Sequence, residues 1–551
     1  MPFKRICGIS INSYLVFITE FVYLFLILGA KKGFTQQAKI PQTTVSQQSS
    51  NPYEENKVFK LDSDADKQLI KIGEINFVGN TVFSEAQLRK AISALDGEEL
   101  TVDKLISLRT KITNLYSNNG YISSAAFLPP QEITDGKITF QIIEGSLESI
   151  VIEGRSRLSE KYISSRLPKI GTPVKLDELN ASLKKLKNDP LIDELKASLK
   201  QSELGKNVLV IDLKENKSFT TSLSTTNGYS SSIGSLGGTV GLNYHVLGLG
   251  DFVNLDYTRT EGLDRFAAGY SLPVNSQNGQ IRIKYTTADT EIIEEPVSAL
   301  DIQADYKAYE IGFTQPVIQS DNNNLTVSVQ FEHIDSETFI DNDFSFPFVD
   351  GLEDGVSKIS VIRLVQEFYN QQNNSSFALR SQFSVGLDLF DSTVTTVGTD
   401  SLFWSWQGQS QWLKKIDDIL LVSNLKLQLS DDRLLPLEQI AIGGINNVRG
   451  YRSNLSLGDN GVIGTLELQI PLLNNRSKIN LIPFIDAGTV WSNSRTAVDA
   501  NTLASIGLGI SYQLGNTIEA RIDYGIPLIS VDAAEDISTT QPFSFQFSFQ
   551  P

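Results

Sequence analysis

Strict alternation of hydrophobic and polar residues dominates the chain from about residue 218 to its end. In TIEARIDYGI (517–526), apolar side chains occupy every second position, with Glu519, Arg521 and Asp523 between them. FSFQFSF (543–549) and LVSNLKLQLS (421–430) show the same period of two. Because successive side chains of a strand point to opposite faces, this period predicts strands with one apolar and one polar face. About sixteen such segments fit between 218 and 550.

Two structures fit a charged face opposite an aliphatic face: a soluble sandwich, or an outer-membrane barrel whose charges face a wet lumen. About sixteen strands in roughly 335 residues are more than one sandwich contains, but this number is ordinary for a membrane barrel. Alternate connections are short, such as NNRS (474–477), and most of those between are long, such as 432–460. Short periplasmic turns and long outer loops have this pattern. The loop 432–460 follows the eleventh strand, so we expect it to start on the extracellular side.

Between residues 70 and 216 the pattern predicts two copies of a β-α-α-β-β module. Ser84 and Thr101 are the expected N-caps of the two helices in the first copy. The elements of the first copy are 71–80, 84–95, 101–120, 121–128 and 137–145, and those of the second are 146–154, 159–167, 175–187, 192–201 and 207–215.

The N-terminus is typical of an export signal, with a basic start and the apolar run YLVFITEFVYLFLILGA (14–30). An uncleaved membrane anchor is the alternative. A Gln/Ser/Pro-rich segment follows and predicts a flexible linker. The expected organisation is a signal peptide (1–38), a linker (39–69), a first module (70–145), a second module (146–216) and a barrel (217–551).

Composition narrows the chemistry. The net charge of −17 at pH 7 argues against a nucleic-acid binder, which needs a basic face. Cys7 is the single cysteine, so the rest of the chain can form neither a disulfide nor a thiolate metal site. Only His245 and His333 are available for the histidine-centred sites of hydrolases and zinc enzymes. With no phosphate-binding loop, we expect no enzyme, cofactor, metal, nucleotide or nucleic-acid partner.

Two short motifs, VRGY (448–451) and FIDAG (484–488), resemble the paired signatures of the outer-membrane assembly and secretion superfamily. LPPQEITDGKITFQIIEGSLESIVIEG (128–154) is similar to the first POTRA module of two-partner secretion transporters of the haemolysin-activator type. The resemblance implies two periplasmic α/β POTRA domains followed by a sixteen-stranded antiparallel transmembrane β-barrel, in the outer membrane of a diderm bacterium. Members often carry an N-terminal helix that plugs the barrel, but 31–60 shows no amphipathic helix, so we expect no stable plug.

The resemblance also implies that the VRGY loop folds back into the barrel and touches the FIDAG strand. Alternation places Phe484, Asp486 and Gly488 on one face of the strand. Because a charged Asp side chain in contact with lipid costs much free energy, we expect this face to be lumenal. The planar fork of Arg449 can bind a carboxylate bidentately, which predicts a lumenal Arg449–Asp486 ion pair. Gly450 and Gly488 would let loop and wall approach closely. The predicted loop site is Arg449, Gly450, Tyr451, Phe484, Asp486 and Gly488; the alternative is that Arg449 is a solvated loop charge.

A second predicted site lies on the first module, where strand 121–128 could be a sheet edge to which an extended client adds as another strand. Tyr121, Ile122 and Phe127 belong to this strand. An apolar groove beside the helix would take the client's side chains, with Leu105, Leu108, Ile112 and Leu115 as its lining. The alternative, which we favour for most of these four, is that they form the module's own core.

The leading hypothesis is an outer-membrane translocator that recognises an unfolded exoprotein with its POTRA domains and secretes it through the barrel pore. The resemblance implies a β-rich client, adhesin or haemolysin-like, with outer-membrane lipid as the other partner. The alternative is an insertase that assembles other outer-membrane proteins. A passive porin is disfavoured by residues 70–215.

Overall fold

The chain forms two compact units, one with both α/β modules and one with the barrel. Among the residues that the structure describes, no helix is long and apolar enough to span a membrane. The structure is a computed structural model. It describes residues 69–93, 98–154, 157–187, 189, 191–320, 322–341, 344–348, 352, 354–395, 399–474, 477–493, 501–531 and 538–551.

The first module has the predicted β-α-α-β-β order and a three-stranded sheet in the order β2-β5-β4. Ser84 caps α2 in a reciprocal capping box with Gln87, and Thr101 caps α3, which confirms both predicted N-caps. Strand β5 runs parallel to β2 and antiparallel to β4. The elements are β1 (Ile70–Lys71), β2 (Glu74–Val78), α2 (Glu85–Ile92), β3 (Glu99–Leu100), α3 (Val102–Asn118), β4 (Ala125–Phe127) and β5 (Lys137–Ile143), with β1 paired to β3.

Glu144, directly after β5, joins three parts of the first module. Its carboxylate accepts hydrogen bonds from the backbone N–H groups of Thr81 (2.8 Å) and Val82 (2.9 Å) and from the hydroxyl of Tyr116 (2.7 Å). Burial opposes ionisation, but these hydrogen bonds and one from the Thr81 hydroxyl outweigh it and lower the pKa of Glu144. The carboxylate thus ties the β2–α2 connection to α3 and to the end of β5.

The second module repeats the order with the sheet β6-β8-β7. Its core lies between this sheet and the helices, where Leu179, Leu183 and Leu186 of the longer helix are buried against Leu209 and Ile211. The elements are β6 (Ser146–Glu153), α4 (Glu160–Ser164), α5 (Leu176–Lys187), β7 (Ile192–Glu203) and β8 (Lys206–Glu215).

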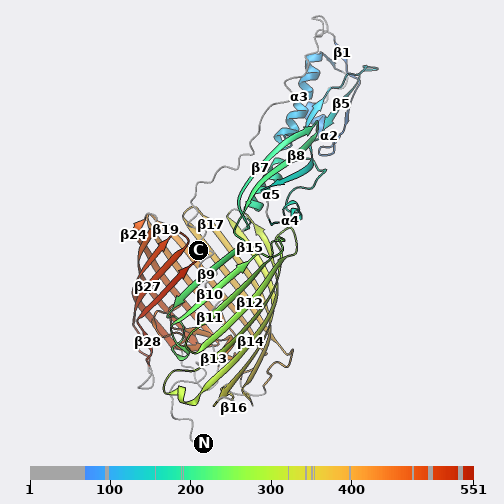
Figure 1. Cartoon of the computed structure of the whole chain (residues 1–551). Coiled ribbons are helices and arrows are strands. Elements are labelled where there is room, and N and C mark those ends of the chain that lie inside the picture. The colour runs from blue at the N-terminus through green and yellow to red at the C-terminus, as the bar shows by residue number, and fades with distance from the viewer. Residues whose placement is uncertain are drawn as a thin grey trace. The chain divides into compact units, whose positions relative to one another are not determined.

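The strands that follow the second module form the predicted closed antiparallel barrel, which has sixteen strands in the described part of the chain (Figure 1). A further two-residue strand, β16 (Phe344–Ser345), adds to the end of β15. The barrel strands are β9 (Phe219–Thr226), β10 (Gly237–Tyr244), β11 (Phe252–Arg259), β12 (Leu263–Pro273), β13 (Gln280–Glu291), β14 (Ile302–Gln319), β15 (Asn323–Ile340), β17 (Val356–Gln372), β18 (Ser375–Leu387), β19 (Trp404–Ile416), β20 (Ile419–Leu429), β24 (Asn460–Asn474), β25 (Ser477–Trp491), β26 (Asn501–Leu514), β27 (Ile518–Pro527) and β29 (Phe543–Phe549).

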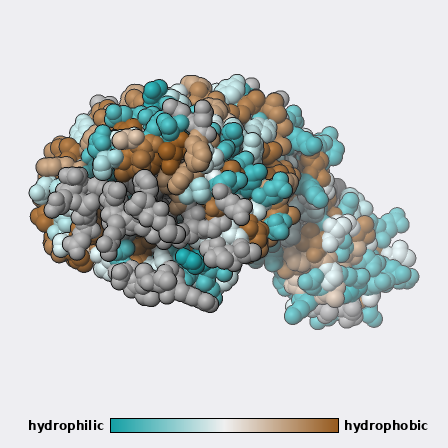
Figure 2. All heavy atoms as spheres, turned by 90° about the horizontal axis from the view of Figure 1, so that it is seen from below, coloured by the Kyte–Doolittle hydropathy of each residue, from teal (hydrophilic) through white to brown (hydrophobic). Residues whose placement is uncertain are grey.

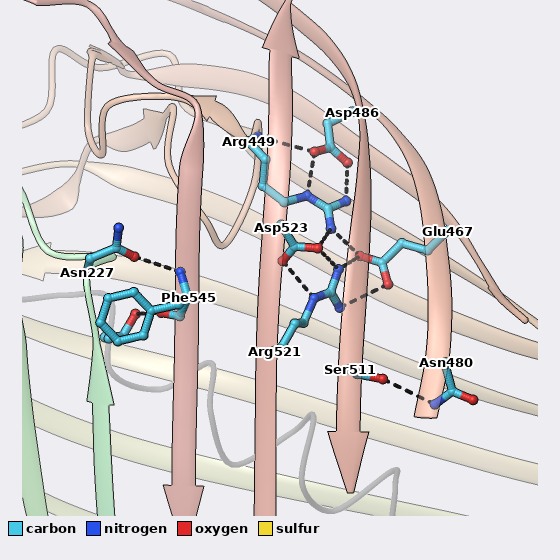
Figure 3. A network of polar contacts seen from close by, with 10 residues as sticks. Asn227, Arg449, Glu467, Asn480, Asp486, Ser511, Arg521, Asp523 and Phe545 are labelled. Atoms are coloured by element: carbon cyan, nitrogen blue, oxygen red, sulfur yellow. Dashed lines mark hydrogen bonds and ion pairs between the residues drawn. The ribbon is translucent and has the colours of Figure 1, made fainter. Parts of the chain in front are cut away.

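Strands β9 and β29 close the barrel over a short register, from Thr226 opposite Gln546 to Leu223 opposite Phe549. Beyond the end of this register, the side chain of Asn227 takes the place of a backbone partner. Its amide donates to the carbonyl of Phe543 (3.0 Å) and accepts from the N–H of Phe545 (2.8 Å; Figure 3). Side-chain amides therefore extend the seam where backbone pairing ends.

The predicted faces of the strands are confirmed. On β27, Ile522, Tyr524 and Ile526 are exposed on the outside, whereas Asp523 between them is buried on the lumenal side. In Figure 2, which is seen from below, hydrophobic residues lie along the rim of the barrel among hydrophilic ones. Strand β14 has 18 residues, more than the 9–11 or so that cross a bilayer, so it continues beyond the membrane.

Connections between strands mostly alternate in length as predicted, apart from the short one at 260–262 between β11 and β12, and the longest joins β20 to β24. Strand β9 begins directly after the second module and is the first to run outward, so β20, the eleventh, also runs outward. Its connection, residues 430–459, starts at the extracellular end, as expected; we call it the lumenal loop. It contains η6 (Pro436–Glu438), β21 (Ile440–Ile442), β22 (Gly450–Tyr451) and β23 (Ser456–Gly458).

Candidate functional site

The lumenal loop has a tightly turned tip. Strands β21 and β23 pair as a hairpin, and the turn after β21 uses Gly443 and Gly444 at φ +100° and +106°, values that side chains rarely allow. The side-chain oxygen of Asn447 accepts hydrogen bonds from the N–H groups of Gly443 (2.7 Å) and Val448 (2.6 Å). This turn presents the next residue, Arg449, to the barrel wall.

Arg449 is buried and contacts Asp486 of β25 as predicted. Its Nε lies 2.8 Å from Oδ2 and its Nη2 lies 2.7 Å from Oδ1, so the guanidinium binds the carboxylate bidentately (Figure 3). The backbone N–H of Arg449 also donates to Oδ2 (3.2 Å). The side chain of Asp486 is 0% exposed and that of Arg449 is 4% exposed, which excludes the alternative of a solvated loop charge.

Three further charged residues of the wall complete a buried charge network around this pair. Arg449 Nη1 lies 2.6 Å from Oε1 of Glu467 on β24 and 3.7 Å from Oδ1 of Asp523 on β27. Arg521 binds both Glu467 (2.8 Å) and Asp523 (2.7 Å). Sequence reasoning placed Arg521 and Asp523 on the lumenal face but did not join them to the loop, and it missed Glu467. We call these five residues the charge network.

The predicted aromatic residues support the same position of the loop. The guanidinium of Arg449 lies over the ring of Phe484, 3.5 Å from its centroid, in cation–π contact. The hydroxyl of Tyr451 lies 2.8 Å from the carbonyl oxygens of both Ala504 and Ile529, which share its one proton. Tyr451 also belongs to an apolar cluster with Val448 and wall residues of β24–β26. Charge, ring and hydroxyl contacts therefore fix the tip on one side of the wall.

Both predicted glycines lie where the loop and the wall meet, as expected, but each faces a different partner. Gly450, at φ +91°, faces Gly525 of β27, and a Cβ on Gly450 would come within 2.9 Å of the Gly525 backbone. The closest approach of loop and wall at these glycines is therefore between Gly450 and Gly525. A Cβ on Gly488 would meet Ile463 at 3.2 Å and Val448 at 3.4 Å, so its small size serves the packing of the apolar cluster.

A second ion pair joins the tip to the outer connections. Arg452 binds Glu294 bidentately at 2.9 and 2.7 Å, and its Nη2 also donates to the hydroxyl of Ser232 (3.3 Å). Glu294 lies between β13 and β14, and Ser232 lies between β9 and β10. Nothing in the sequence pattern indicated this contact, because both acceptors come from irregular segments.

The predicted client groove on the first module is not supported. Leu105, Leu108 and Ile112 are at most 2% exposed and belong to the module core, with Leu115 packed against it. Tyr121 packs edge-on against Phe83 and Tyr116 of the same core. The favoured alternative, that the helix residues are core, is therefore correct.

The predicted edge strand is shorter and less accessible than expected. The segment 121–128 contains a strand only at Ala125–Phe127, and this strand lies at the sheet edge as predicted. However, the N–H of Ala126 already donates to the hydroxyl of Thr113 on α3 (3.1 Å). Ile122 and Phe127 are half-buried. A client strand would have to displace Thr113 to pair along this edge.

The architecture defines a class: an outer-membrane β-barrel that follows POTRA-type modules and holds an internal loop by a buried arginine. The match to the family described as haemolysin secretion/activation protein ShlB/FhaC/HecB covers residues 205–512, more than half of the chain, and the chain belongs to this family. Residues 70–145 match the ShlB-type POTRA domain. The predicted family is confirmed.

Similar proteins agree with this assignment. The outer membrane transporter CdiB of Escherichia coli is 22% identical over 487 residues, 84% of this chain and 79% of that protein. The heme/hemopexin transporter protein HuxB of Haemophilus influenzae (strain 86-028NP) is 22% identical over 467 residues, 78% and 79% of the two chains.

Two solved structures share the fold. CdiB from Escherichia coli has a TM-score of 0.64 at 19% identity, over 89% of this chain and 92% of that one. BamA from Haemophilus ducreyi has a TM-score of 0.54 at 14% identity, over 87% and 100%.

The chain is thus an outer-membrane transporter of two-partner secretion with periplasmic POTRA domains, and it acts with a secreted exoprotein. This confirms the predicted function and location. The insertase alternative is less supported, because the likeness to BamA shows the fold alone. The predicted signal peptide, most of the linker and the predicted absence of a plug concern residues 1–68, which lie outside the described residues.

Proposed function

We propose that the chain secretes an unfolded, β-rich exoprotein of adhesin or haemolysin type, which its POTRA domains capture and its barrel passes outward as an extended hairpin. The observation that supports this most is the charge network. Four buried ionisable groups and the half-buried Arg521 hold one loop inside the lumen, where it borders the path of a client. Folding of the exoprotein outside the cell would supply the direction of transport.

The loop has to keep its place while a polypeptide slides past. A buried ion pair contributes more to geometry than to net stability, because desolvation offsets much of the Coulomb gain. Arg449 draws its carboxylate partners from β24, β25 and β27, so the tip is tied to several strands rather than to one. This arrangement suits an element that must stay in position during transport.

For client capture, we propose the edge strand β7 of the second module instead of β4. Strand β7 lies at the edge of its sheet and has 12 residues, against three in β4. An extended client can add to such an edge through backbone hydrogen bonds that do not depend on its sequence. The side chains of Lys196 and Lys200 on this strand are exposed.

Two experiments test the proposal. Deletion of the protein should remove one large exoprotein from the medium and leave the other outer-membrane proteins at their normal levels. A general fall of outer-membrane proteins would favour the insertase instead. Arg449→Ala and Asp486→Ala should reduce secretion even where heat-modifiable mobility shows a folded, inserted barrel; normal secretion by both variants would refute the role of the loop.

The capture site is tested by cross-linking. A photo-reactive amino acid at Lys200 of β7 should cross-link the exoprotein during arrested secretion. The same group at Lys185, exposed on α5 of the same module, is the matched control and should give little product. Equal yields at both positions, or none at Lys200, would exclude β7 as the capture edge.

A further inference from the structure

A buried apolar cluster lies at the outer end of the barrel, where a polar lumen is the rule. On β14 the side chains of Lys307 and Tyr309 are exposed on the outside, so Tyr306 and Ala308 point inward. Both belong to the cluster, in which no member is more than 6% exposed. The wall residues are Leu263, Ala288, Ile302, Tyr306, Ala308, Ile334, Ile359 and Val361, and the residues from connections are Ile233, Ile292, Val297, Phe403, Leu434, Leu435 and Leu437.

The lumenal loop contributes three leucines to this cluster. Leu434, Leu435 and Leu437 lie in the first leg of the loop and are at most 3% exposed. They pack with lumenal residues of β12–β17 and with the outer connections between strands. The charge network lies elsewhere, on β24, β25 and β27. The first leg and the tip of the loop therefore dock on different parts of the wall.

One ion pair fastens the first leg at its end. Arg363 of β17 binds Glu438 bidentately, with distances of 2.6 and 3.0 Å between nitrogen and carboxylate oxygen. The same guanidinium binds Glu332 of β15 (3.1 Å) and donates to the hydroxyl of Ser384 (3.1 Å). The side chain of Glu438 is 3% exposed and that of Arg363 is 12% exposed. Arg363 is thus the wall residue that binds the charge at the end of the apolar segment.

We propose that residues 434–438 close the outer exit of the pore and that Arg363 holds them closed. This exit seal leaves the wall during transport, while the charge network keeps the tip in place. Apolar contacts are non-directional and can re-form in many geometries, whereas the Arg363–Glu438 fork sets one closed position. The opening of the seal during transport rests on the proposed function, because an exoprotein must leave through this exit. Closure itself is a property of the barrel alone and can be measured without a client.

The first test is conductance of the full-length protein in planar bilayers. Glu438→Gln keeps the shape of the side chain but removes its charge, and Arg363→Met removes the binding group. Each should raise the fraction of time in the open state about tenfold, which corresponds to about 1.4 kcal/mol.

Arg380→Met is the matched control for these variants. It removes another lumenal arginine, which pairs with Glu367 (2.7 Å) and not with the loop. It should leave the open fraction unchanged. An unchanged open fraction in Glu438→Gln, or an equal rise in the control, would overturn the inference. Arg363→Met alone decides nothing if its heat-modifiable mobility shows a misfolded barrel, so Glu438→Gln carries the test.

The second test follows the seal in cells. Leu437→Cys in a Cys7→Ser background gives a single cysteine. A membrane-impermeant maleimide should label it only when the exoprotein is co-expressed, whereas Leu402→Cys, in an exposed outer connection, should be labelled always. Labelling of Leu437→Cys without the exoprotein, or its absence while secretion proceeds, would overturn the inference. Failure of the capture or deletion experiments would leave the conductance result standing.

Discussion

Replacing Arg449 with alanine tests whether charge balance holds the lumenal loop. The network contains two arginines, Arg449 and Arg521, and three carboxylates, Asp486, Glu467 and Asp523, for a net charge of 2 − 3 = −1. The variant would leave 1 − 3 = −2. Asp486, 0% exposed, would keep only the backbone N–H of residue 449. Loss of one partner from a buried pair costs about 3–5 kcal/mol, and we expect a loss of unfolding free energy in this range.

A sharper expectation concerns Asp486→Asn, whose effect on the free energy of unfolding should change sign when Arg449 is absent. Asp486→Asn alone gives 2 − 2 = 0 and leaves Arg449 its contacts with Glu467 and Asp523, so it should cost about 1.5–3 kcal/mol. In the Arg449→Ala background the same change returns the net charge from −2 to −1 and removes an unpaired buried carboxylate. There it should stabilise the protein.

Urea unfolding of the barrel in lipid vesicles, followed by tryptophan fluorescence, measures both effects. The four proteins of the double-mutant cycle are compared at one pH and one lipid composition. If Asp486→Asn destabilises the protein equally with and without Arg449, the two residues are not coupled. The charge-balance reasoning would then be refuted.

Three further changes have expected outcomes. Gly450→Ala should cost about 1–3 kcal/mol in the same urea assay, since φ is +91° and Gly525 is in the way, whereas Gly515→Ala (φ +56°, no atom within 4 Å) should cost about 1–2 kcal/mol. Tyr451→Phe should lose about 1–2 kcal/mol of unfolding free energy and speed proteolysis of the loop, because the carbonyls of Ala504 and Ile529 lose the donor that they share. The folded state lowers the pKa of Glu144, so its ionised carboxylate stabilises the first module. This stabilisation should be fully present above the unfolded pKa of about 4.3 and should be lost as the pH falls through the folded pKa. Amide hydrogen exchange of residues 81–82 should show this loss, and Glu144→Gln should abolish the pH dependence.

Alternation along β25 was enough to predict the inward direction of Asp486, and the chemistry of arginine was enough to predict its partner. The rest of the charge network depends on strand register. Thr465 is the residue directly opposite Asp486, yet the second carboxylate comes from Glu467, two residues further along β24. The alternation of apolar and polar residues shows on which face of the sheet a side chain lies. It does not show which residue of the next strand is its neighbour. The pairing of Glu467 with Arg449 therefore could not be predicted from the sequence.

In the first module, helical periodicity predicted which residues lie on one face of a helix but not what that face contacts. Leu105, Leu108 and Ile112 form an apolar stripe, and such a stripe looks alike whether it faces its own sheet or a client. The structure shows that it faces the core. The accessibility of β4 depended on a side chain from another element, the hydroxyl of Thr113. Local patterns predicted the elements well, whereas contacts between elements decided which groups remain available.

The lumenal loop uses two kinds of contact, and their physics suits two mechanical roles. The charge network is directional, since one guanidinium satisfies carboxylates on several strands only when Arg449 occupies one position. Moving it would leave charges buried and unpaired, at a cost of several kcal/mol. The exit seal is apolar apart from Glu438, and when it leaves the wall, another apolar or extended chain can cover the surface it exposed. A loop with a fixed tip and a releasable leg can therefore open the exit without losing its own place in the barrel.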